Sequence, residues 1–121
     1  MPRERLPVGE LTDEALLAGF EAGDEESTLA FVRRFQARVF GVAVAVLGDG
    51  HTAEDVAQLT FVRAWRHART YDSRRGSVVS WMNSIARNAA IDASRVRVAT
   101  PTDAIELLER AGVADDSPER A

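Results

Sequence analysis

The sequence of 121 residues contains no cysteine and no lysine, and none of its apolar runs is long. Without cysteine, the chain can form neither a disulfide framework nor a thiolate metal site or nucleophile, and we expect a reducing, cytoplasmic setting. The most apolar run, Val39 to Leu47, is too short to span a bilayer, and the N-terminus lacks the apolar core of a signal peptide. We therefore expect a soluble protein without a membrane partner. Its apolar content of 45% suffices for one domain with a modest core.

Motifs for catalysis and cofactor binding are also missing from the sequence. The two histidines, His51 and His67, are far apart and have no convincing pair of acids around them. There is no glycine-rich phosphate loop, no zinc-ligand spacing and no arrangement for a nucleophile. We therefore expect no enzyme activity, no cofactor and no metal.

Charge is strongly segregated along the chain, although the net charge is only −4. Residues 58–100 hold eight Arg against two Asp, whereas residues 1–57 hold five Arg against eleven acids and residues 101–121 hold two Arg against six acids. Clustered arginines favour a phosphate-bearing partner such as nucleic acid. The absence of lysine is equally expected of a GC-rich genome, so the clustering alone carries the signal.

Apolar periodicity and helix-breaking residues predict an all-α fold, a compact bundle of about four helices, because no segment alternates as a strand would. Thr12 is expected to cap the first helix and Asp24 the second. The spacing of Thr52 and Asp55 resembles a capping box, which predicts the start of the third helix. The expected helices cover residues 12–22, 24–47, 52–70 and 77–98. A flexible N-terminus, the helical domain and a partly ordered acidic tail are expected at residues 1–10, 11–98 and 99–121.

The second expected helix is predicted to be the central core helix, because its last nine residues are apolar almost all round. The alternative is that a partner covers part of this helix. Its apolar positions are Leu29, Val32, Phe35, Val39, Val42 and Val46.

The third expected helix has two faces when its residues are projected about 100° apart. The face predicted to point into the core comprises Ala57, Phe61, Ala64 and Ala68, with Thr60 and Trp65 at its edges. The opposite face comprises Asp55, Gln58, Leu59, Val62, Arg66 and Arg69. Leu59 and Val62 would expose apolar area to water unless something covers them. This face predicts a docking surface for a protein, with coverage by another helix of the domain as the alternative.

The fourth expected helix combines an apolar stripe with a polar face that lacks acids. The apolar stripe comprises Val78, Met82, Ile85, Ala89, Ala93 and Val96. The polar face comprises Ser80, Asn83, Ser84, Arg87, Asn88, Ser94 and Arg95, with Ile91 as its one apolar member. A solvated face in an acidic protein usually carries both signs of charge, whereas a face with only cationic and hydrogen-bonding groups suits phosphates and base edges.

The connection before this helix adds arginines and an aromatic side chain. It contains Tyr71, Arg74, Arg75 and Ser77, and Trp81 follows at the boundary between the polar face and the apolar stripe. Bases of single-stranded nucleic acid stack on aromatic rings, for about 1–3 kcal/mol each, while cations follow the backbone. The connection and the polar face together predict binding of single-stranded nucleic acid. In the alternative, Trp81 is a core residue and the two arginines belong to a solvated loop.

Three linked segments read E-D-V-A-Q-L-T-F-V-R-A-W-R at 54–66, Y-D-S-R-R-G-S at 71–77 and W-M-N-S-I-A-R-N-A-A-I-D at 81–92. They resemble conserved region 2 of bacterial sigma factors, most closely that of the small extracytoplasmic-function (group IV) class. The segment at 30–49 is similar to region 2.1 of the same family, so the resemblance covers about residues 11–97. It implies a transcription initiation factor, of a class that serves stress responses, that carries out no chemistry itself.

The resemblance also implies a role for the exposed face of the third helix. In this family the helix with the pattern E-D-x-x-Q binds the clamp helices of the RNA polymerase β′ subunit. The polymerase-binding residues would then be Asp55, Gln58, Leu59 and Val62. The family commonly has an acid where Leu59 stands, and this departure implies a more apolar contact.

The connection and the fourth helix resemble the part of the family that opens and reads the promoter −10 element. There the non-template single strand is captured with one base flipped into a pocket. The residues of the connection would line the entry to that pocket, and those of the helix would lie near the point of strand separation or hold backbone and bases. The implied DNA-binding residues are Arg74, Arg75, Ser77, Trp81, Asn83, Arg87, Asn88 and Arg95.

Complete sigma factors of this class have a second helical domain, region 4, which binds the −35 element, and the residues after Val98 leave no room for it. We therefore expect residues 99–121 to begin an interdomain linker and the chain to be an excised domain, with a reduced relative as the alternative. The same two faces would also suit a protein-interaction module whose main partner is a regulatory protein such as an anti-sigma factor.

Overall fold

The computed structural model describes residues 6–98, and over this range the chain forms four α-helices, two short 3-10 helices and no strand. The elements are η1 (Val8–Glu10), α1 (Asp13–Glu21), α2 (Glu25–Leu47), α3 (Gly50–His67), η2 (Ala68–Thr70) and α4 (Val78–Val98). The predicted all-α class and the four predicted helices are confirmed. The acidic tail predicted for residues 99–121 lies outside the described residues. No helix of the described range is long and apolar enough to cross a membrane.

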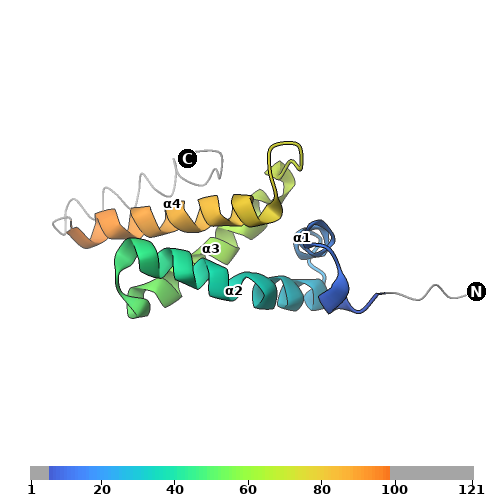
Figure 1. Cartoon of the computed structure of the whole chain (residues 1–121), viewed down its shortest axis with the longest axis horizontal. Coiled ribbons are helices and arrows are strands. Elements are labelled where there is room, and N and C mark those ends of the chain that lie inside the picture. Colours follow the sequence, from blue (N-terminus) through green and yellow to red (C-terminus); the bar gives the residue numbers. More distant parts are fainter. Residues whose placement is uncertain (1–5, 99–121) are drawn as a thin grey trace, which may run out of the picture.

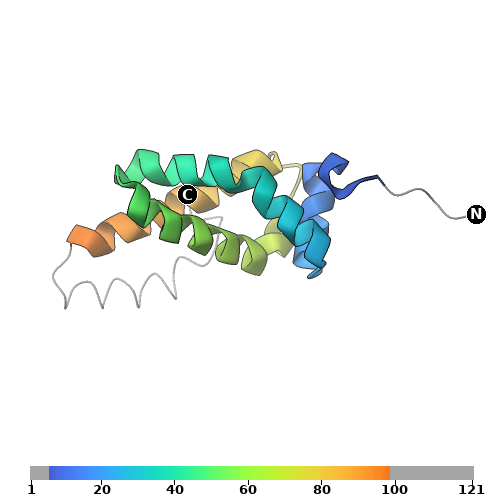
Figure 2. The ribbon, with the colours of Figure 1, turned by 90° about the horizontal axis from the view of Figure 1, so that it is seen from below.

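Three helices, α2, α3 and α4, pack into a bundle, and α1 closes one end of it (Figure 1). Both views show α2 and α4 running in the same direction and α3 running in the opposite direction (Figure 2). Each of the three long helices contacts the other two. One side of each long helix is therefore left at the surface.

The two predicted N-caps of the first helices are confirmed. The Thr12 hydroxyl oxygen accepts a hydrogen bond from the Ala15 backbone amide at 3.1 Å, and an Asp24 carboxylate oxygen accepts one from the Ser27 amide at 2.9 Å. Such caps satisfy backbone N–H groups that have no partner within the helix. At the other end of α2, Gly48 adopts the left-handed conformation (φ 70°) that ends the helix before α3.

The predicted start of the third helix at Thr52 is wrong, because Asp49 caps α3. The Asp49 carboxylate accepts a hydrogen bond from the His51 amide at 3.0 Å, and α3 therefore begins at Gly50. The Thr52 hydroxyl donates to the same carboxylate at 2.7 Å. A carboxylate can accept several hydrogen bonds at once, so the acid takes the capping position and the threonine supports it.

The core has an aromatic end and a small-residue end. At the aromatic end, the ring of Phe31 stacks on Phe20 of α1 with centroids 4.6 Å apart, and Leu16, Val39, Met82 and Ile85 are buried around it. At the other end the buried side chains are Ala43, Ala53, Val56, Ala89 and Ala90. Small side chains allow helix axes to approach closely, and at this end residues of α2, α3 and α4 share one buried cluster.

The predicted central helix is only partly buried, and two of its predicted core positions are wrong. Leu29 is 50% exposed and Val46 is 37% exposed. Phe31, two positions from Leu29, is fully buried instead. Residues two apart on a helix lie about 200° apart around its axis, so Leu29 and Phe31 cannot share one stripe. The apolar run in α2 therefore includes residues on the surface as well as in the core.

A salt bridge in the interior joins α3 to α4. The Arg63 guanidinium lies 3.0 Å from the Asp92 carboxylate, and the two side chains are only 9% and 12% exposed. The residues are 29 positions apart in the sequence, and the pair takes Arg63 out of the cationic surface predicted from its arginine cluster. Nearly buried charges must remain paired, because an unpaired one is expensive to desolvate.

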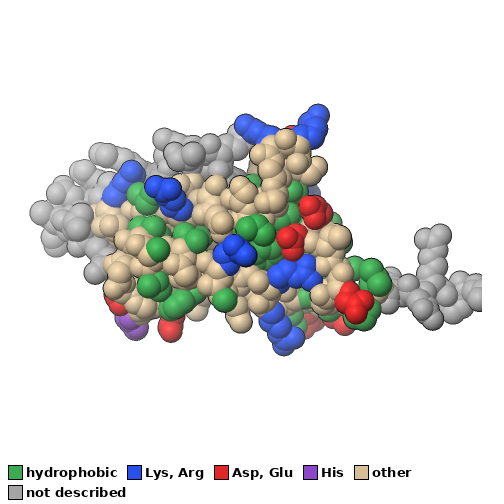
Figure 3. Space-filling model, viewed as in Figure 1, with side chains coloured by type: hydrophobic (Ala, Val, Ile, Leu, Met, Phe, Trp, Pro, Cys, Tyr) green, Lys and Arg blue, Asp and Glu red, His purple; other side chains and the backbone are tan. Residues whose placement is uncertain are grey.

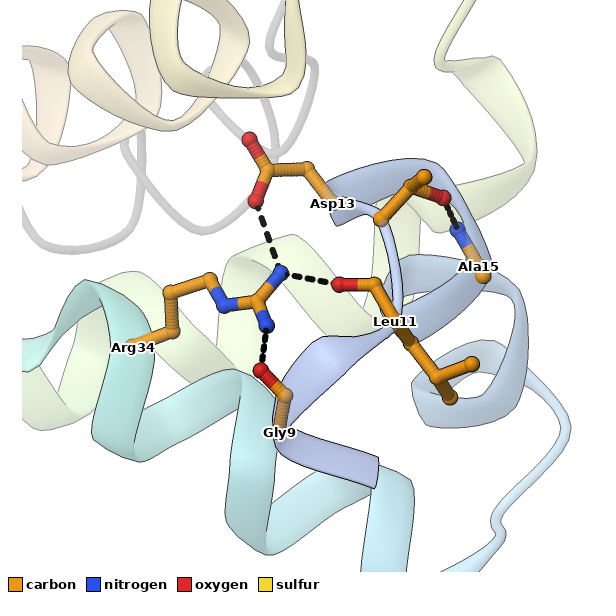
Figure 4. A network of polar contacts seen from close by, with 6 residues as sticks. Gly9, Leu11, Asp13, Ala15 and Arg34 are labelled. Atoms are coloured by element: carbon orange, nitrogen blue, oxygen red, sulfur yellow. Dashed lines mark hydrogen bonds and ion pairs between the residues drawn. The ribbon is translucent and has the colours of Figure 1, made fainter. Parts of the chain in front are cut away.

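A second arginine fastens the N-terminal segment to α2 (Figure 4). The Arg34 guanidinium donates hydrogen bonds to the backbone carbonyls of Leu11 at 2.6 Å and Gly9 at 2.7 Å, and to the Asp13 carboxylate at 3.1 Å. The planar guanidinium presents several N–H donors in fixed directions, so one side chain can bind all three acceptors. Arg34 thereby holds η1 and the start of α1 against the bundle.

Replacing Arg63 with Ala should destabilise the protein by about 3–5 kcal/mol, because it leaves the Asp92 carboxylate nearly buried without this partner. Urea unfolding followed by far-UV circular dichroism measures the loss. The double variant Arg63→Met with Asp92→Leu should lose less than the single variant, since no charge then remains buried. Arg33→Ala, at an exposed position of α2, is the control. An Arg63→Ala variant as stable as Arg33→Ala would contradict the assignment.

Candidate nucleic-acid and protein interfaces

The residues predicted to bind a protein lie on the exposed side of α3. Asp55 and Gln58 are exposed, and the apolar side chains of Leu59 and Val62 are 39% and 49% exposed. No helix within residues 6–98 covers them, so the alternative of coverage by the domain itself is excluded for that range. The four predicted residues therefore share one accessible surface.

Trp65 belongs to this surface as well, contrary to its predicted place at the edge of the core. Its side chain is 55% exposed. Trp65 follows Val62 by three residues, and residues three apart are neighbours on a helix surface. That spacing was the available sequence signal, because it places Trp65 nearer to Val62 than to the buried Ala64. We define the docking surface as Asp55, Gln58, Leu59, Val62 and Trp65.

The connection from α3 to α4 is closed by its own hydrogen bonds. The Tyr71 hydroxyl donates to the Gly76 carbonyl at 2.9 Å, and the Arg75 amide donates to the Asp72 carbonyl at 2.9 Å. Burial raises the pKa of Tyr71, and the nearby carboxylates of Glu14, Asp72 and Asp13 raise it further. The Tyr71 hydroxyl therefore stays protonated, and able to donate across the loop, to a higher pH than an ordinary tyrosine would.

The two loop arginines are exposed, and one of them is held by an acid. The Arg74 side chain and backbone amide both donate to the Asp72 carboxylate, with the guanidinium Nε 3.2 Å from the carboxylate oxygen. These hydrogen bonds lower the pKa of Asp72, with a smaller contribution from the charge of Arg75. The Ser77 hydroxyl oxygen accepts from the Ser80 amide at 3.1 Å and so caps α4. The loop thus presents its arginines from a fixed turn.

Trp81 is neither a fully buried core residue nor a fully exposed one, the two alternatives considered from the sequence. Its side chain is half-buried and packs against the aromatic end of the core. Its ring also meets that of Tyr71 edge-on, with centroids 5.7 Å apart and planes at 67°. Edge-to-face contact of this kind is a favourable aromatic geometry. Trp81 therefore anchors the loop to α4 and still keeps part of its ring at the surface.

The polar face of α4 combines exposed arginines with half-buried amides. Arg87 and Arg95 are exposed, whereas Asn83 and Asn88 are half-buried. The Asn83 side-chain oxygen is buried without a hydrogen-bond partner in the part of the chain described. These side chains are spread along the polar side of the helix, and Figure 3 shows cationic side chains over α4 and over the loop.

Several arginines of the arginine-rich residues 58–100 form ion pairs with acids, so the folded surface is less cationic than the sequence suggests. Arg63 pairs with Asp92, Arg69 pairs with Glu21 at 2.8 Å, and Arg74 pairs with Asp72. The Arg95 guanidinium is 3.9 Å from the Asp92 carboxylate. Among the described residues, no acid pairs with Arg87. Arg87 is therefore the strongest candidate on α4 for contact with an external anion.

Comparisons with known proteins agree with the resemblance seen in the sequence. The family model for sigma-70 region 2 matches residues 31–99. The chain is 35% identical, over 98 residues, to an ECF RNA polymerase sigma factor SigK of Mycolicibacterium vanbaalenii, covering 81% of this chain and 50% of that protein. It is 32% identical over 84 residues to SigK of Mycobacterium tuberculosis strain H37Ra, covering 69% of this chain and 44% of that protein. The chain thus spans about half the length of the curated relatives it matches.

Replacing Arg74 with Ala should raise the pKa of Asp72 toward its ordinary value, because the lowered pKa depends mainly on the Arg74 side chain. A carboxyl-carbon NMR titration measures this pKa. In the parent protein the Arg74–Asp72 contact should be present at neutral pH and be lost as the pH falls through the lowered pKa, since protonation removes the carboxylate charge. Arg75→Ala should give a smaller rise. An unchanged Asp72 pKa in Arg74→Ala would refute the loop geometry.

Proposed function

The chain belongs to the sigma-70 region 2 family, and we propose that it serves transcription initiation by binding the RNA polymerase core through α3 and promoter DNA through the loop and α4. The separation of two chemically different exposed faces on adjacent helices carries this proposal. The face on α3 is apolar with polar flanks, and the face on α4 and the loop is cationic with aromatic neighbours. One domain can then hold a protein and a nucleic acid at once.

The docking surface has the composition of a protein interface. Three apolar side chains, Leu59, Val62 and Trp65, lie exposed within two turns of α3. Tryptophan is enriched among the residues that contribute most to binding, and apolar side chains gain when a partner excludes water from them. Asp55 and Gln58 can supply polar contacts at its edge. The β′ clamp helices are the partner proposed for this surface, with the apolar Leu59 strengthening the water-excluding part of the contact.

The loop and the polar face of α4 have the composition required to capture a single DNA strand. Exposed Arg74, Arg75 and Arg87 supply positive charge for phosphates, and the partly exposed ring of Trp81 can stack on a base. Flipping a base out of the duplex costs a few kcal/mol, which these contacts must offset. We propose that this surface melts the promoter −10 element and holds its non-template strand, a role in binding rather than catalysis.

A regulatory protein is the second candidate partner, and the exposed apolar side chains of the docking surface favour it. An anti-sigma factor that covered Leu59, Val62 and Trp65 would block polymerase from the same site. This candidate is compatible with the first, because one surface can serve two partners in turn. In either case we propose that residues 11–98 act as the region 2 domain in the cytoplasm and that residues 99–121 begin the linker.

Trp65→Ala should weaken binding to RNA polymerase core by about 2 kcal/mol, or about thirtyfold, because it removes the largest apolar side chain of the docking surface. Asp55→Ala combined with Gln58→Ala should also weaken it. Biolayer interferometry with immobilised core enzyme measures both. Leu29→Ala is the control, since Leu29 is a similarly exposed apolar residue but lies on α2. Equal losses for Leu29→Ala and Trp65→Ala would remove the support for a specific surface on α3.

Single-tryptophan variants should separate the two faces by fluorescence. With Trp65→Phe, the remaining Trp81 should change its emission when a single-stranded −10-like oligonucleotide binds, because a base stacks on or near its ring. With Trp81→Phe, the remaining Trp65 should not respond to the oligonucleotide, because it lies on the protein-docking side. Fluorescence anisotropy of the labelled oligonucleotide confirms binding in each case. Binding without any change in Trp81 emission would place the strand elsewhere.

A further inference from the structure

Two exposed arginines on α2, Arg33 and Arg38, are left unused by the two faces described above. Arg34 fastens the N-terminal segment, but Arg38, one turn further along α2, is exposed. Within the described residues, the Arg38 guanidinium has no acidic partner, in contrast to Arg63, Arg69 and Arg74. Its charge is therefore available to an external anion.

The side of α2 that carries Arg38 points away from α3. Phe40 marks the side toward α3, because a Cβ added at Gly50 would lie 3.7 Å from the Phe40 ring. Arg38 precedes Phe40 by two residues and so points to roughly the opposite side of α2, about 160° away. Val42, one turn after Arg38 and on the same side, is half-buried against the core. Arg38 consequently lies at the edge of the core, on the side of α2 away from α3.

Arg87 lies on the side of α4 that points away from α3, because it is about 140° around the helix from Asp92, which pairs with Arg63 of α3. It also stands at a similar level along the bundle to Arg38. Ala43 of α2 is buried in one cluster with Ala89 and Ala90 of α4, and the two helices run in the same direction. Arg38 precedes Ala43 by five residues and Arg87 precedes Ala89 by two. The two arginines therefore differ in level by about one turn or less, at roughly 1.5 Å per residue. Figure 3 shows cationic side chains over both helices on the face where α2 and α4 lie side by side.

We propose that Arg38 adds a phosphate contact to the DNA-binding surface, which then crosses the seam between α2 and α4 instead of stopping at the edge of α4. Single-stranded DNA is the occupant, because two arginines without acidic partners flank the seam and a nucleic-acid backbone supplies closely spaced negative charges. This inference rests on the proposed function of the loop and α4. It adds α2 to the elements that hold the strand.

The salt dependence of binding by the full chain tests this contact. Anisotropy of a fluorescein-labelled single-stranded oligodeoxynucleotide gives the binding constant at several NaCl concentrations. The logarithm of the binding constant falls as the logarithm of the salt concentration rises, and we call the magnitude of this fall the slope. Each phosphate contact adds about 0.7 to the slope for single strands. Arg38→Gln should therefore lower the slope by about 0.7. Arg33→Gln should leave it unchanged, because Arg33 is also exposed on α2 but lies about 140° away around the helix.

Arg87→Gln separates failure of this inference from failure of the proposed function. A lowered slope for Arg87→Gln with an unchanged slope for Arg38→Gln would overturn the Arg38 contact alone. Equal reductions for Arg38→Gln and Arg33→Gln would also overturn it, since they would reflect only the net charge. No binding by the parent chain at low salt, or an unchanged slope for Arg87→Gln, would overturn the DNA-binding surface itself. Arg38 is exposed, so unchanged circular dichroism is expected and verifies that each variant is folded.

Discussion

A salt bridge between two nearly buried side chains, Arg63 of α3 and Asp92 of α4, holds the two candidate surfaces in a fixed relation. Desolvating two charges costs several kcal/mol per ion, so such a pair adds little net stability compared with apolar packing, yet neither charge tolerates the loss of the other. The pair therefore specifies one arrangement of the helices. Its carboxylate also approaches Arg95 on the polar face of α4, at 3.9 Å. Asp92 thus contacts both Arg63, on the helix that carries the docking surface, and Arg95, a residue predicted to contact DNA.

The loop between these helices extends the same constraint. Tyr71 closes the loop through its hydrogen bond to Gly76 and packs edge-on against Trp81, while Ser77 caps α4. At the other end of the bundle, small buried side chains bring α2, α3 and α4 together. When a partner is bound to α3, the loop and α4 are consequently held in a defined orientation relative to that partner. In the proposed function, this fixed arrangement would position the bound −10 strand relative to the polymerase when α3 binds the polymerase.

Local features of the fold were predictable from the sequence, whereas contacts between distant residues were not. The caps Thr12 and Asp24 and the exposed face of α3 follow from residue type and helical spacing. The Arg63–Asp92 pair spans 29 positions and leaves no periodic signal, so Arg63 was counted as part of the cationic surface. Trp65 falls near the boundary between the two faces of α3, where a large aromatic side chain favours a core assignment on composition alone. Whether such a residue is buried depends on how the helices are aligned against one another, and helical periodicity in the sequence does not reveal this alignment.

The central claim is that one rigid domain presents a protein-binding face on α3 and a DNA-binding face on the loop and α4. A ¹H–¹⁵N NMR titration of the labelled chain, first with a β′ clamp-helix fragment and then with a single-stranded −10-like oligonucleotide, tests it most directly. The fragment should shift the amide and indole signals of Leu59, Val62 and Trp65, and the oligonucleotide should shift those of Arg74, Trp81 and Arg87. Two separate sets of shifted signals are the predicted result. Shifts of the same residues by both ligands, or DNA shifts centred on the docking surface, would contradict the account.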